Sequence, residues 1–547
     1  MNAPATAADG RPLMTQRQLT LVFGGLMLAL LLAALDQTIV STALLTIVNQ
    51  LNPVSGASEM PWVVTAYLLT STAVTPIYGK LADLYGPKRI FMFAIVLFLA
   101  GSVLSGMSQT MGELIAFRAL QGLGGGGLMS LVFTIIGQVV PPRERGKYQG
   151  LFTSVFMLAM VIGPLIGGFF TDQHALLGIT GWRYIFYVNI PVGLAALVVI
   201  SAALHVQESR VKHRIDYTGA ALITAAASSV LLAAQLGANG QYAWGSSVVI
   251  SLFAAGAVLF AVFVAWELKA ASEPILPMHL FRNSIFTVSN LIAFVVGVTM
   301  MGSLIYLSVY LQFVVGYSPT MAGLAILPMM AGIMPVSIIG GRLISRMGKY
   351  RVFPIVGSAI AVVGMFLLSQ LSVSSTAAQR GLYMFVLGVG LGMVMPVLTL
   401  AVQNALPLRE IGTGTAANLF FRNMGSSFGT AIFGAILTNR IGSYFKQLPV
   451  SELKKAAGLG TSLDRAQLDK TTASDPALKA TILHDFVQAM SVVFTVAAAI
   501  MVVAFVLSLF LKQVELRSMG APKPAAQGSP EADDAVAELE APAPALH

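Results

Sequence analysis

The chain has 547 residues, of which 56% are hydrophobic and only 10% charged, with a mean hydropathy of +0.80 and a formal net charge of +9. Soluble domains carry about 25% charged residues, so most of this chain must face something other than water. The lack of cysteine excludes disulfides and thiolate chemistry, and the six histidines stand singly without metal-ligand spacing, so we expect neither a metal nor a cofactor.

Apolar stretches long enough to cross a bilayer, which takes about 20 residues, recur along the chain. The first is too long for the apolar core of a signal peptide, about 7–15 residues, and no cleavage site follows it. The expected spans are 19–47, 61–80, 90–108, 112–139, 148–170, 184–205, 217–237, 246–267, 285–312, 320–341, 352–371, 380–403, 413–437 and 485–511. These fourteen spans predict an all-α integral membrane protein with both termini on the same side.

The positions of arginine and lysine predict the orientation, because cytoplasmic loops are enriched in them. With the N-terminus inside, 21 of the 32 basic residues fall in cytoplasmic segments. Most of the others lie in one long outer loop, 438–484, and long loops carry little weight in this rule. We therefore expect both termini in the cytoplasm. The net positive charge then indicates contact with membrane lipids and not with nucleic acid.

The spans divide the chain into a cytoplasmic segment 1–18, a six-helix bundle 19–205, an inserted helix pair with linkers 206–282, a second six-helix bundle 283–512 and a cytoplasmic tail 513–547. The bundles share a repeat, since Gly79–Arg89 aligns with Gly341–Arg351. Two six-span halves of this kind place a substrate site between them, near the bilayer midplane. The outer loop 438–484 has room for a short amphipathic helix, and the Pro-, Ala- and Glu-rich tail predicts disorder.

Short motifs stand at defined places on these spans. They are Leu35–Val40 in span 1, Gly79–Arg89 after span 2, Arg118–Gly122 in span 4, Gly163–Gly168 in span 5, and Trp182–Phe186 with Asn189–Gly193 at the entry to span 6. Through them the chain resembles the major facilitator superfamily, in its fourteen-span drug:proton antiporter branch (EmrB/QacA-like). The resemblance implies two six-helix bundles plus two inserted helices. It also implies a transporter and not an enzyme, which exports small amphipathic drugs, dyes and biocides across the inner membrane, driven by the proton gradient.

Asp36 and Arg118 are the candidates for proton coupling. A charge at the bilayer centre costs roughly 2.5–3.5 kcal/mol on insertion scales, so an ionisable residue in a membrane span indicates a functional or structural role that offsets this cost. Burial favours the neutral form of a carboxyl group, which would let Asp36 take up a proton from one side and release it to the other. The resemblance implies that Arg118 couples this proton to conformation. The alternative is that both side chains only make fixed hydrogen bonds to neighbouring helices.

The loop after span 2 is the candidate conformational latch, with Gly79, Asp83, Gly86, Lys88 and Arg89 as its residues. Gly86 permits a tight reversal, and Asp83 can accept hydrogen bonds from the N-terminus of a helix that slides past it. The second half has Ser345 at the position of Asp83, so we expect the two loops to differ in their chemistry. The alternative is an ordinary basic inner loop.

The candidate antiporter motif is Gly163, Pro164, Gly167 and Gly168, which removes side chains and one backbone donor from span 5. This composition favours close helix packing, which either seals the path against proton leak or serves packing alone. The candidate residues of the substrate cavity are Gln37, Ser41, Tyr306, Tyr310, Asn418 and Arg422. The tyrosine stripe also fits a packing surface, and a structural role for Arg422 is equally open.

Other classes of function find little support in the sequence. Gly122-x-Gly124-x-x-Gly127 fits a dinucleotide-binding pattern, but it lies inside an expected membrane helix and follows no strand. The sequence has no phosphate loop of the Gly-Lys-Ser/Thr type, which favours ion-driven over ATP-driven transport. A specific metabolite, lipid or siderophore is an alternative substrate. Some members of the branch work with a periplasmic adaptor and an outer-membrane channel, and these partners stay open.

Overall fold

The computed structural model describes residues 16–51, 56–172, 175–176, 179–204, 215–238, 241–445, 465–473 and 475–516. The first half of the chain forms α1 (Gln16–Leu51), α2 (Gly56–Tyr85), α3 (Pro87–Met107), α4 (Met111–Val139), α5 (Pro142–Asp172), η1 (Gly181–Arg183), α6 (Tyr184–Tyr187) and α7 (Asn189–Ala203). Two helices follow, α8 (Tyr217–Ala238) and α9 (Ser247–Lys269). A two-residue hairpin, β1 (Ala175–Leu176) with β2 (Ile179–Thr180), is the only strand pairing in the described ranges.

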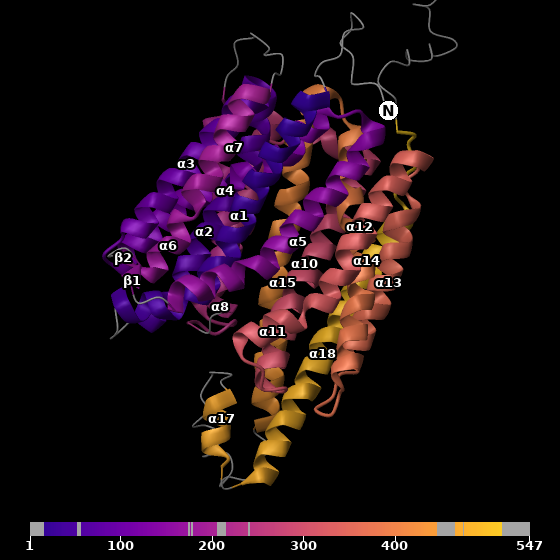
Figure 1. Ribbon diagram of the computed structural model, residues 1–547. Helices are drawn as coiled ribbons and strands as arrows, with labels where there is room; N and C mark the ends of the chain where they lie inside the picture. Colours follow the sequence, from indigo (N-terminus) through magenta and orange to yellow (C-terminus); the bar gives the residue numbers. More distant parts are fainter. Residues whose placement is uncertain are drawn as a thin grey trace, which may run out of the picture.

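The second half repeats the pattern of long helices (Figure 1). It consists of η2 (Met278–Arg282), α10 (Ser284–Phe313), α11 (Pro319–Ala325), α12 (Leu327–Met347), α13 (Val352–Ser369), α14 (Ala377–Ala405), η3 (Leu408–Glu410), α15 (Ile411–Phe445), α17 (Arg465–Thr471) and α18 (Pro476–Leu509). The expected all-α architecture is therefore confirmed for the part of the chain that the structure describes.

Twelve helical stretches in the described ranges are long and apolar enough to cross a membrane. The protein is therefore a multi-pass membrane protein. The two long helices outside this set, α2 and α15, are rich in Gly, Ser and Thr, which lowers their hydropathy. Both pack inside the bundle, where α2 contacts α4 and α15, and α15 contacts α10. Polar helices of this kind are sheltered from lipid by their neighbours.

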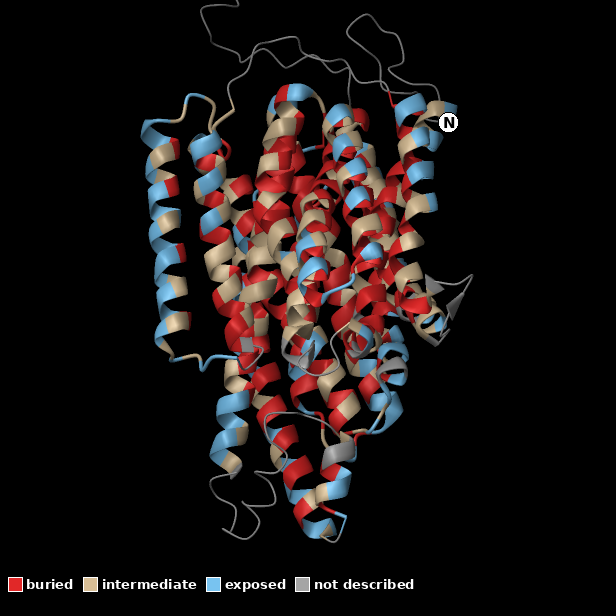
Figure 2. Ribbon diagram, turned by 90° about the vertical axis from the view of Figure 1, so that its left-hand side faces the viewer, coloured by how far each residue is buried: buried red, intermediate tan, exposed pale blue. Residues whose placement is uncertain are grey.

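Each half of the molecule has its own apolar core. The first core joins residues of α1, α3, α4 and α7, such as Leu26, Phe91 and Ile135. The second joins residues of α10, α13 and α18, such as Met365 and Phe494. Figure 2 shows that the buried residues face the interior of the bundle and the exposed ones its outside. Large apolar side chains are among the exposed residues of α3, α9 and α13, as expected of a surface that faces lipid.

The structure differs from the expected spans at the outer loop 438–484. Helix α15 continues to Phe445 and α18 begins at Pro476, so both project beyond the expected ends of their spans (Figure 1). Asp475 accepts a hydrogen bond from the backbone N–H of Leu478 and thereby caps α18, and Pro476 suits a first helical turn. Helix initiation by a cap needs no apolar sequence, which is why hydropathy misplaced the boundary.

The short helix expected in that loop corresponds to α17, whose Leu468 is buried. The remainder of the loop between α15 and α17, residues 446–464, lies outside the described residues. The same holds for 1–15 of the expected N-terminal segment and for 517–547 of the expected disordered tail.

Candidate functional site

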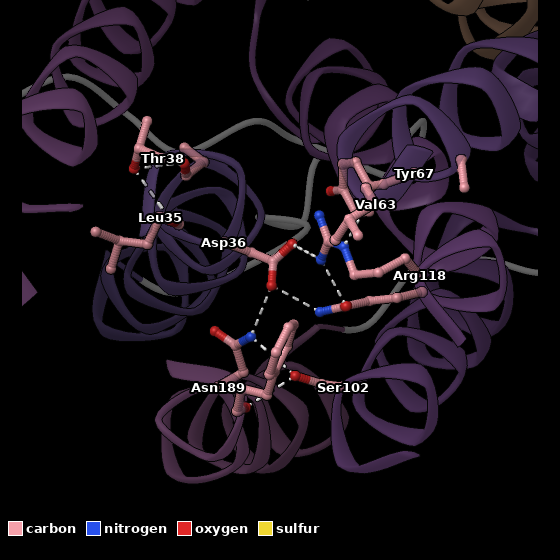
Figure 3. Close-up of polar contacts among 12 residues, drawn as sticks. Leu35, Asp36, Thr38, Val63, Tyr67, Ser102, Arg118 and Asn189 are labelled. Carbon is pink, nitrogen blue, oxygen red and sulfur yellow. Dashed lines mark hydrogen bonds and ion pairs between the residues drawn. The ribbon is translucent and has the colours of Figure 1, made fainter. Parts of the chain in front are cut away.

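Asp36 of α1 lies at the centre of a closed hydrogen-bond network (Figure 3). Its Oδ2 atom lies 2.6 Å from Nη1 of Arg118, and its Oδ1 atom accepts hydrogen bonds from Nε2 of Gln121 at 2.8 Å and from Nδ2 of Asn189 at 3.0 Å. Asp36 is 0% exposed and Arg118 1% exposed. One guanidinium and two amides therefore surround the carboxylate, which satisfies a charge that would otherwise be costly to bury.

Arg118 of α4 is held from several directions. Its Nη1 atom also donates to Oε1 of Gln121 at 2.7 Å, and Nε donates to the backbone carbonyl of Val63 on α2 at 3.4 Å. The guanidinium lies over the ring of Tyr67, 4.4 Å from its centroid (Figure 3). Contacts of this kind stabilise a cation that is shielded from water. The arginine thus links α1, α2 and α4 at one point.

Asn189, the first residue of α7, extends the network to α3. Its Nδ2 atom donates to Oγ of Ser102 at 2.9 Å, and the Ser102 hydroxyl donates to the backbone carbonyl of Phe186 at 2.8 Å. Gln121 and Asn189 stand inside the motifs that carried the resemblance, but the sequence did not identify either as a partner of Asp36. Uncharged amides give no signal comparable to an ionisable residue in a membrane span.

The antiporter motif packs directly beside this network. Any Cβ added at Gly163 would collide with Thr38, two residues after Asp36 on α1. Thr38 also donates its hydroxyl to the backbone carbonyl of Ala159 at 3.1 Å, so α5 and α1 are bonded at the same level. Gly167 is buried, whereas Gly168 has open space around it. The side chain of Pro164 lies outside the described residues, and α5 continues as a helix through this position.

The proposed latch joins the two halves. Asp83, near the end of α2, accepts hydrogen bonds from the backbone N–H groups of Gly412 at 2.9 Å and Thr413 at 2.6 Å, in the first turn of α15. A helix N-terminus attracts a carboxylate because its N–H groups are unpaired and its dipole is positive there. Gly79 allows the approach, since a Cβ at this position would lie 2.6 Å from the carbonyl oxygen of Gly412.

The rest of the loop motif has separate roles. Gly86 has φ = 85° and turns the chain from α2 into α3. Lys88 donates from Nζ to the backbone carbonyl of Ser201 near the end of α7 at 2.8 Å, and Arg89 is exposed. The second half differs as expected, because Ser345 bonds within its own helix to the carbonyl of Gly341.

Further contacts between the halves lie at the same end of the bundle, and the sequence did not predict them. Arg145 of α5 donates from Nη1 to the backbone carbonyl of Gln403 on α14 at 3.2 Å, and Nε2 of Gln149 donates to Oε1 of Gln403 at 3.0 Å. A Cβ at Gly150 would collide with the carbonyl oxygen of Ser337 on α12. The two halves are therefore in close contact at the end where α1 begins and α2 ends.

The expected tyrosine stripe packs within the second half. Tyr306 donates from its hydroxyl to the backbone carbonyl of Thr430 at 2.9 Å, and Tyr310 donates to that of Ser372 at 2.8 Å. Both rings are buried, Tyr310 completely. Their contact with substrate stays a prediction, and in this conformation they connect α10 to α15 and to the turn before α14.

The remaining cavity candidates are more varied. Asn418 of α15 is buried, accepts a hydrogen bond from Thr399 at 3.1 Å and donates to Oδ1 of Asn290 at 3.1 Å. Arg422 and Gln37 are half-buried. The side chain of Ser41 lies outside the described residues.

The structure thus shows a buried Asp36–Arg118 ion pair in the first half, and a carboxylate of the first half bonded to the N-terminus of α15 in the second. The family model of the Major Facilitator Superfamily matches residues 26–430, which is most of the chain. The chain belongs to the major facilitator superfamily. Members of this superfamily are transporters and not enzymes, so this protein is a transporter.

Two relatives within the superfamily carry multidrug names. The multidrug transporter protein MdtP of Bacillus subtilis is 38% identical over 458 residues, which are 82% of this chain and 82% of the relative. The multidrug resistance protein 3 of the same organism is 34% identical over 500 residues, 90% of this chain and 95% of the relative. An uncharacterized transporter of the superfamily from Mycobacterium tuberculosis is 38% identical over 520 residues, 94% of this chain and 72% of the relative.

Solved structures support the fold of this superfamily member. The proton:xylose symporter XylE aligns with a TM-score of 0.62 at 14% sequence identity, over 92% of this chain and 98% of the other. The human organic anion transporter MFSD10 aligns with a TM-score of 0.60 at 12% identity, over 89% and 99%. At these identities the likeness concerns the fold alone.

Proposed function

We propose that this transporter exports small amphipathic compounds in exchange for protons. The observation that carries the proposal is the buried Asp36–Arg118 ion pair, which places one protonatable carboxylate in the interior of the first bundle. The multidrug names of two relatives support the class of substrate. Drugs, dyes and biocides are the compounds that we expect it to carry, from the cytoplasm across the inner membrane.

The proton step follows from the donors around Asp36. In the present arrangement Arg118, Gln121 and Asn189 all donate to its carboxylate. Protonation would remove the partner charge of Arg118 and replace one acceptor with a donor, so these hydrogen bonds would have to rearrange. Because the residues sit on α1, α4 and α7, this rearrangement would shift the helices of the first half relative to one another. Proton occupancy and conformation are thereby coupled.

The movement that we propose is alternating access of the two halves. Two sets of hydrogen bonds between the halves hold one end of the bundle closed. Asp83 accepts from the first N–H groups of α15, and Arg145 donates to the backbone carbonyl of Gln403. We place this end in the cytoplasm, as the basic loops predict, and we propose that these contacts close the cytoplasmic path. Breaking these contacts would open the cytoplasmic path. Gly163 against Thr38 would transmit changes near Asp36 to α5, whose other end contacts the second half.

We further propose fourteen membrane crossings, with α2 and α15 added to the twelve apolar helices. The absence of cysteine allows a direct test with single cysteines and a membrane-impermeant maleimide. Cysteines introduced at Arg89 and at Arg351 should react only after the cytoplasmic side is exposed. A cysteine at Ala473, which is exposed between α17 and α18, should react in intact cells. Reaction of all three in intact cells would overturn this topology.

The function itself is tested by Asp36→Asn in cells that lack their own efflux pumps. The asparagine conserves shape but cannot exchange a proton, so energised efflux of dyes should fall to the level of empty cells while the protein still reaches the membrane. Glu113→Gln is the matched control, because Glu113 is exposed at the beginning of α4 and caps the backbone N–H of Gln109. Undiminished dye efflux by Asp36→Asn would exclude the mechanism.

A further inference from the structure

Arg422 is an arginine in the interior of the second half, which has no counterpart of Asp36. It lies in α15 on the helix face that also carries Asn418 and Ser426, four residues to either side. Its guanidinium lies deep among protein atoms, yet part of the side chain stays accessible. A side chain that is both deep and partly accessible is neither fully packed in the core nor turned to lipid.

Arg422 differs from the other deeply placed arginines in its bonding. Arg118 pairs with Asp36, Arg145 donates to two backbone carbonyls, and Arg380 donates to the carbonyl of Ser375 and the hydroxyl of Tyr317. Within the described part of the chain, the Arg422 guanidinium has no hydrogen-bond or ion-pair partner. Its five N–H donors are therefore available, and a desolvated guanidinium without an acceptor is costly.

The neighbouring polar groups leave further donors unused. Asn418 uses its carbonyl to accept from Thr399 and its amide to donate to Asn290. Asn290 is 2% exposed, and its Nδ2 atom is buried without a partner. The acceptor atoms of Asn418 and Asn290 are thus occupied. Two donors remain, the amide of Asn290 and, one turn further along α15 from Asn418, the guanidinium of Arg422. The cluster offers what a ligand with acceptor atoms requires.

The backbone that presents Arg422 is fixed by close helix packing. Gly297 of α10 lies directly against the carbonyl of Arg422, and Gly425 of α15 lies against the carbonyl of Phe294. Neither glycine has room for a Cβ. Small residues at such a crossing hold two helices at short distance, so Arg422 projects from a rigid part of α15. A binding group on a rigid element keeps its geometry when a ligand arrives.

The charges of the interior decide the ligand class. Asp36 and Arg118 neutralise each other, whereas Arg422 has no carboxylate partner among the described residues, and protonation of Asp36 would leave Arg118 as a further unpaired positive charge. Like charges repel more strongly in a low-dielectric interior than in water. We propose that Arg422 binds the head group of the transported compound and that this head group is anionic, such as the carboxylate or phenolate of an amphipathic weak acid. This inference rests on the proposed export function and specifies its substrate.

The experiment uses three dyes with one fluorophore and one tail, ending in a carboxylate, a neutral amide or a quaternary ammonium group. Binding to the purified full-length protein in detergent is measured by fluorescence polarisation for the wild type, Arg422→Gln and Arg422→Lys. The wild type should bind the carboxylate dye best, and Arg422→Gln should weaken that binding about tenfold, the size of a lost charge-assisted hydrogen bond. Binding of the amide dye should change less than about twofold, and Arg422→Lys should recover part of the carboxylate affinity.

Arg440→Gln is the matched control, since Arg440 lies further along the same helix and is exposed. The proposal is overturned if Arg422→Gln binds the carboxylate dye as tightly as the wild type. It is equally overturned if all three dyes lose affinity by the same factor, or if the ammonium dye binds best to the wild type. Efflux in cells distinguishes a failure of this inference from a failure of the proposed export function. If Asp36→Asn loses transport while Arg422→Gln keeps the dye selectivity of the wild type, the export function stands and only the role of Arg422 is excluded.

Discussion

The Nη1 atom of Arg118 lies 2.6 Å from Oδ2 of Asp36, between α4 and α1, and solvent reaches neither side chain. An ion pair in such a place gains little net stability from its own attraction, because removing both charges from water is costly. Breaking the pair is nevertheless expensive, since it leaves one charge alone. A proton that neutralises Asp36 therefore changes the free energy of this part of the first half substantially.

Removal of one partner tests this energetic coupling. Arg118→Gln should lower the stability of the purified protein by about 3–5 kcal/mol, because the carboxylate of Asp36 is left without its cation. The double variant Arg118→Gln with Asp36→Asn should be more stable than Arg118→Gln alone. Thermal unfolding in detergent measures both. Strictly additive losses in the double-mutant cycle would show that the two residues are not energetically coupled.

Asp83→Asn tests the latch. The asparagine loses the charge and one acceptor oxygen at the N-terminus of α15, so the closed end should open more often. We expect a cysteine at Ser337, which is buried beside Gly150, to react with a maleimide about threefold faster in this background, or more. Ser345→Ala is the control, because Ser345 donates to the carbonyl of Gly341 in its own helix, and it should leave the rate unchanged. An unaltered rate in Asp83→Asn would exclude Asp83 from the latch.

The antiporter motif offers a matched pair of glycines. Gly163→Ala places a methyl group on Thr38 and should destabilise the α1–α5 contact by about 1–3 kcal/mol, with reduced dye efflux. Gly168→Ala enters open space and should be neutral. Unfolding temperature and efflux are measured for both variants. Equal behaviour of the two would indicate that the motif does not act through this contact.

A pH effect is expected at the projecting end of α18. Asp469 of α17 bonds to Lys479 at 2.8 Å, and the hydrogen bond from Lys479 holds the pKa of Asp469 below its ordinary range. A lowered pKa in the folded state means that the contact stabilises above the ordinary pKa, about 3.9, and is lost as the pH falls through the lowered value. The protection of α17 against hydrogen exchange, measured relative to the intrinsic exchange rate at each pH, should therefore be the same at pH 7 and pH 5 and decrease only in stronger acid. Asp469 is half exposed, so the effect is small, and a loss of protection already at pH 5 would contradict it.

The sequence predicted the helices well because membrane spans leave a strong hydropathy signal, and it identified Asp36 and Arg118 because ionisable residues are rare in such spans. It did not predict the hydrogen bond from Arg145 to the backbone carbonyl of Gln403, because these residues are 258 apart in the sequence and meet only through the packing of the two halves. Nor could periodicity separate a cavity lining from a packing surface on α10. Tyr306 and Tyr310 share a face, but their hydroxyls bond within the second half.

Direct observation of proton exchange is the most decisive measurement for this account. The purified transporter is reconstituted into liposomes with a pH-sensitive dye in the lumen, and an amphipathic substrate gradient is imposed without any other driving force. We predict that substrate movement drives protons the opposite way for the wild type and for Glu113→Gln, and that Asp36→Asn shows no coupled proton flux. Proton movement of wild-type size in Asp36→Asn would contradict the central role of this carboxylate.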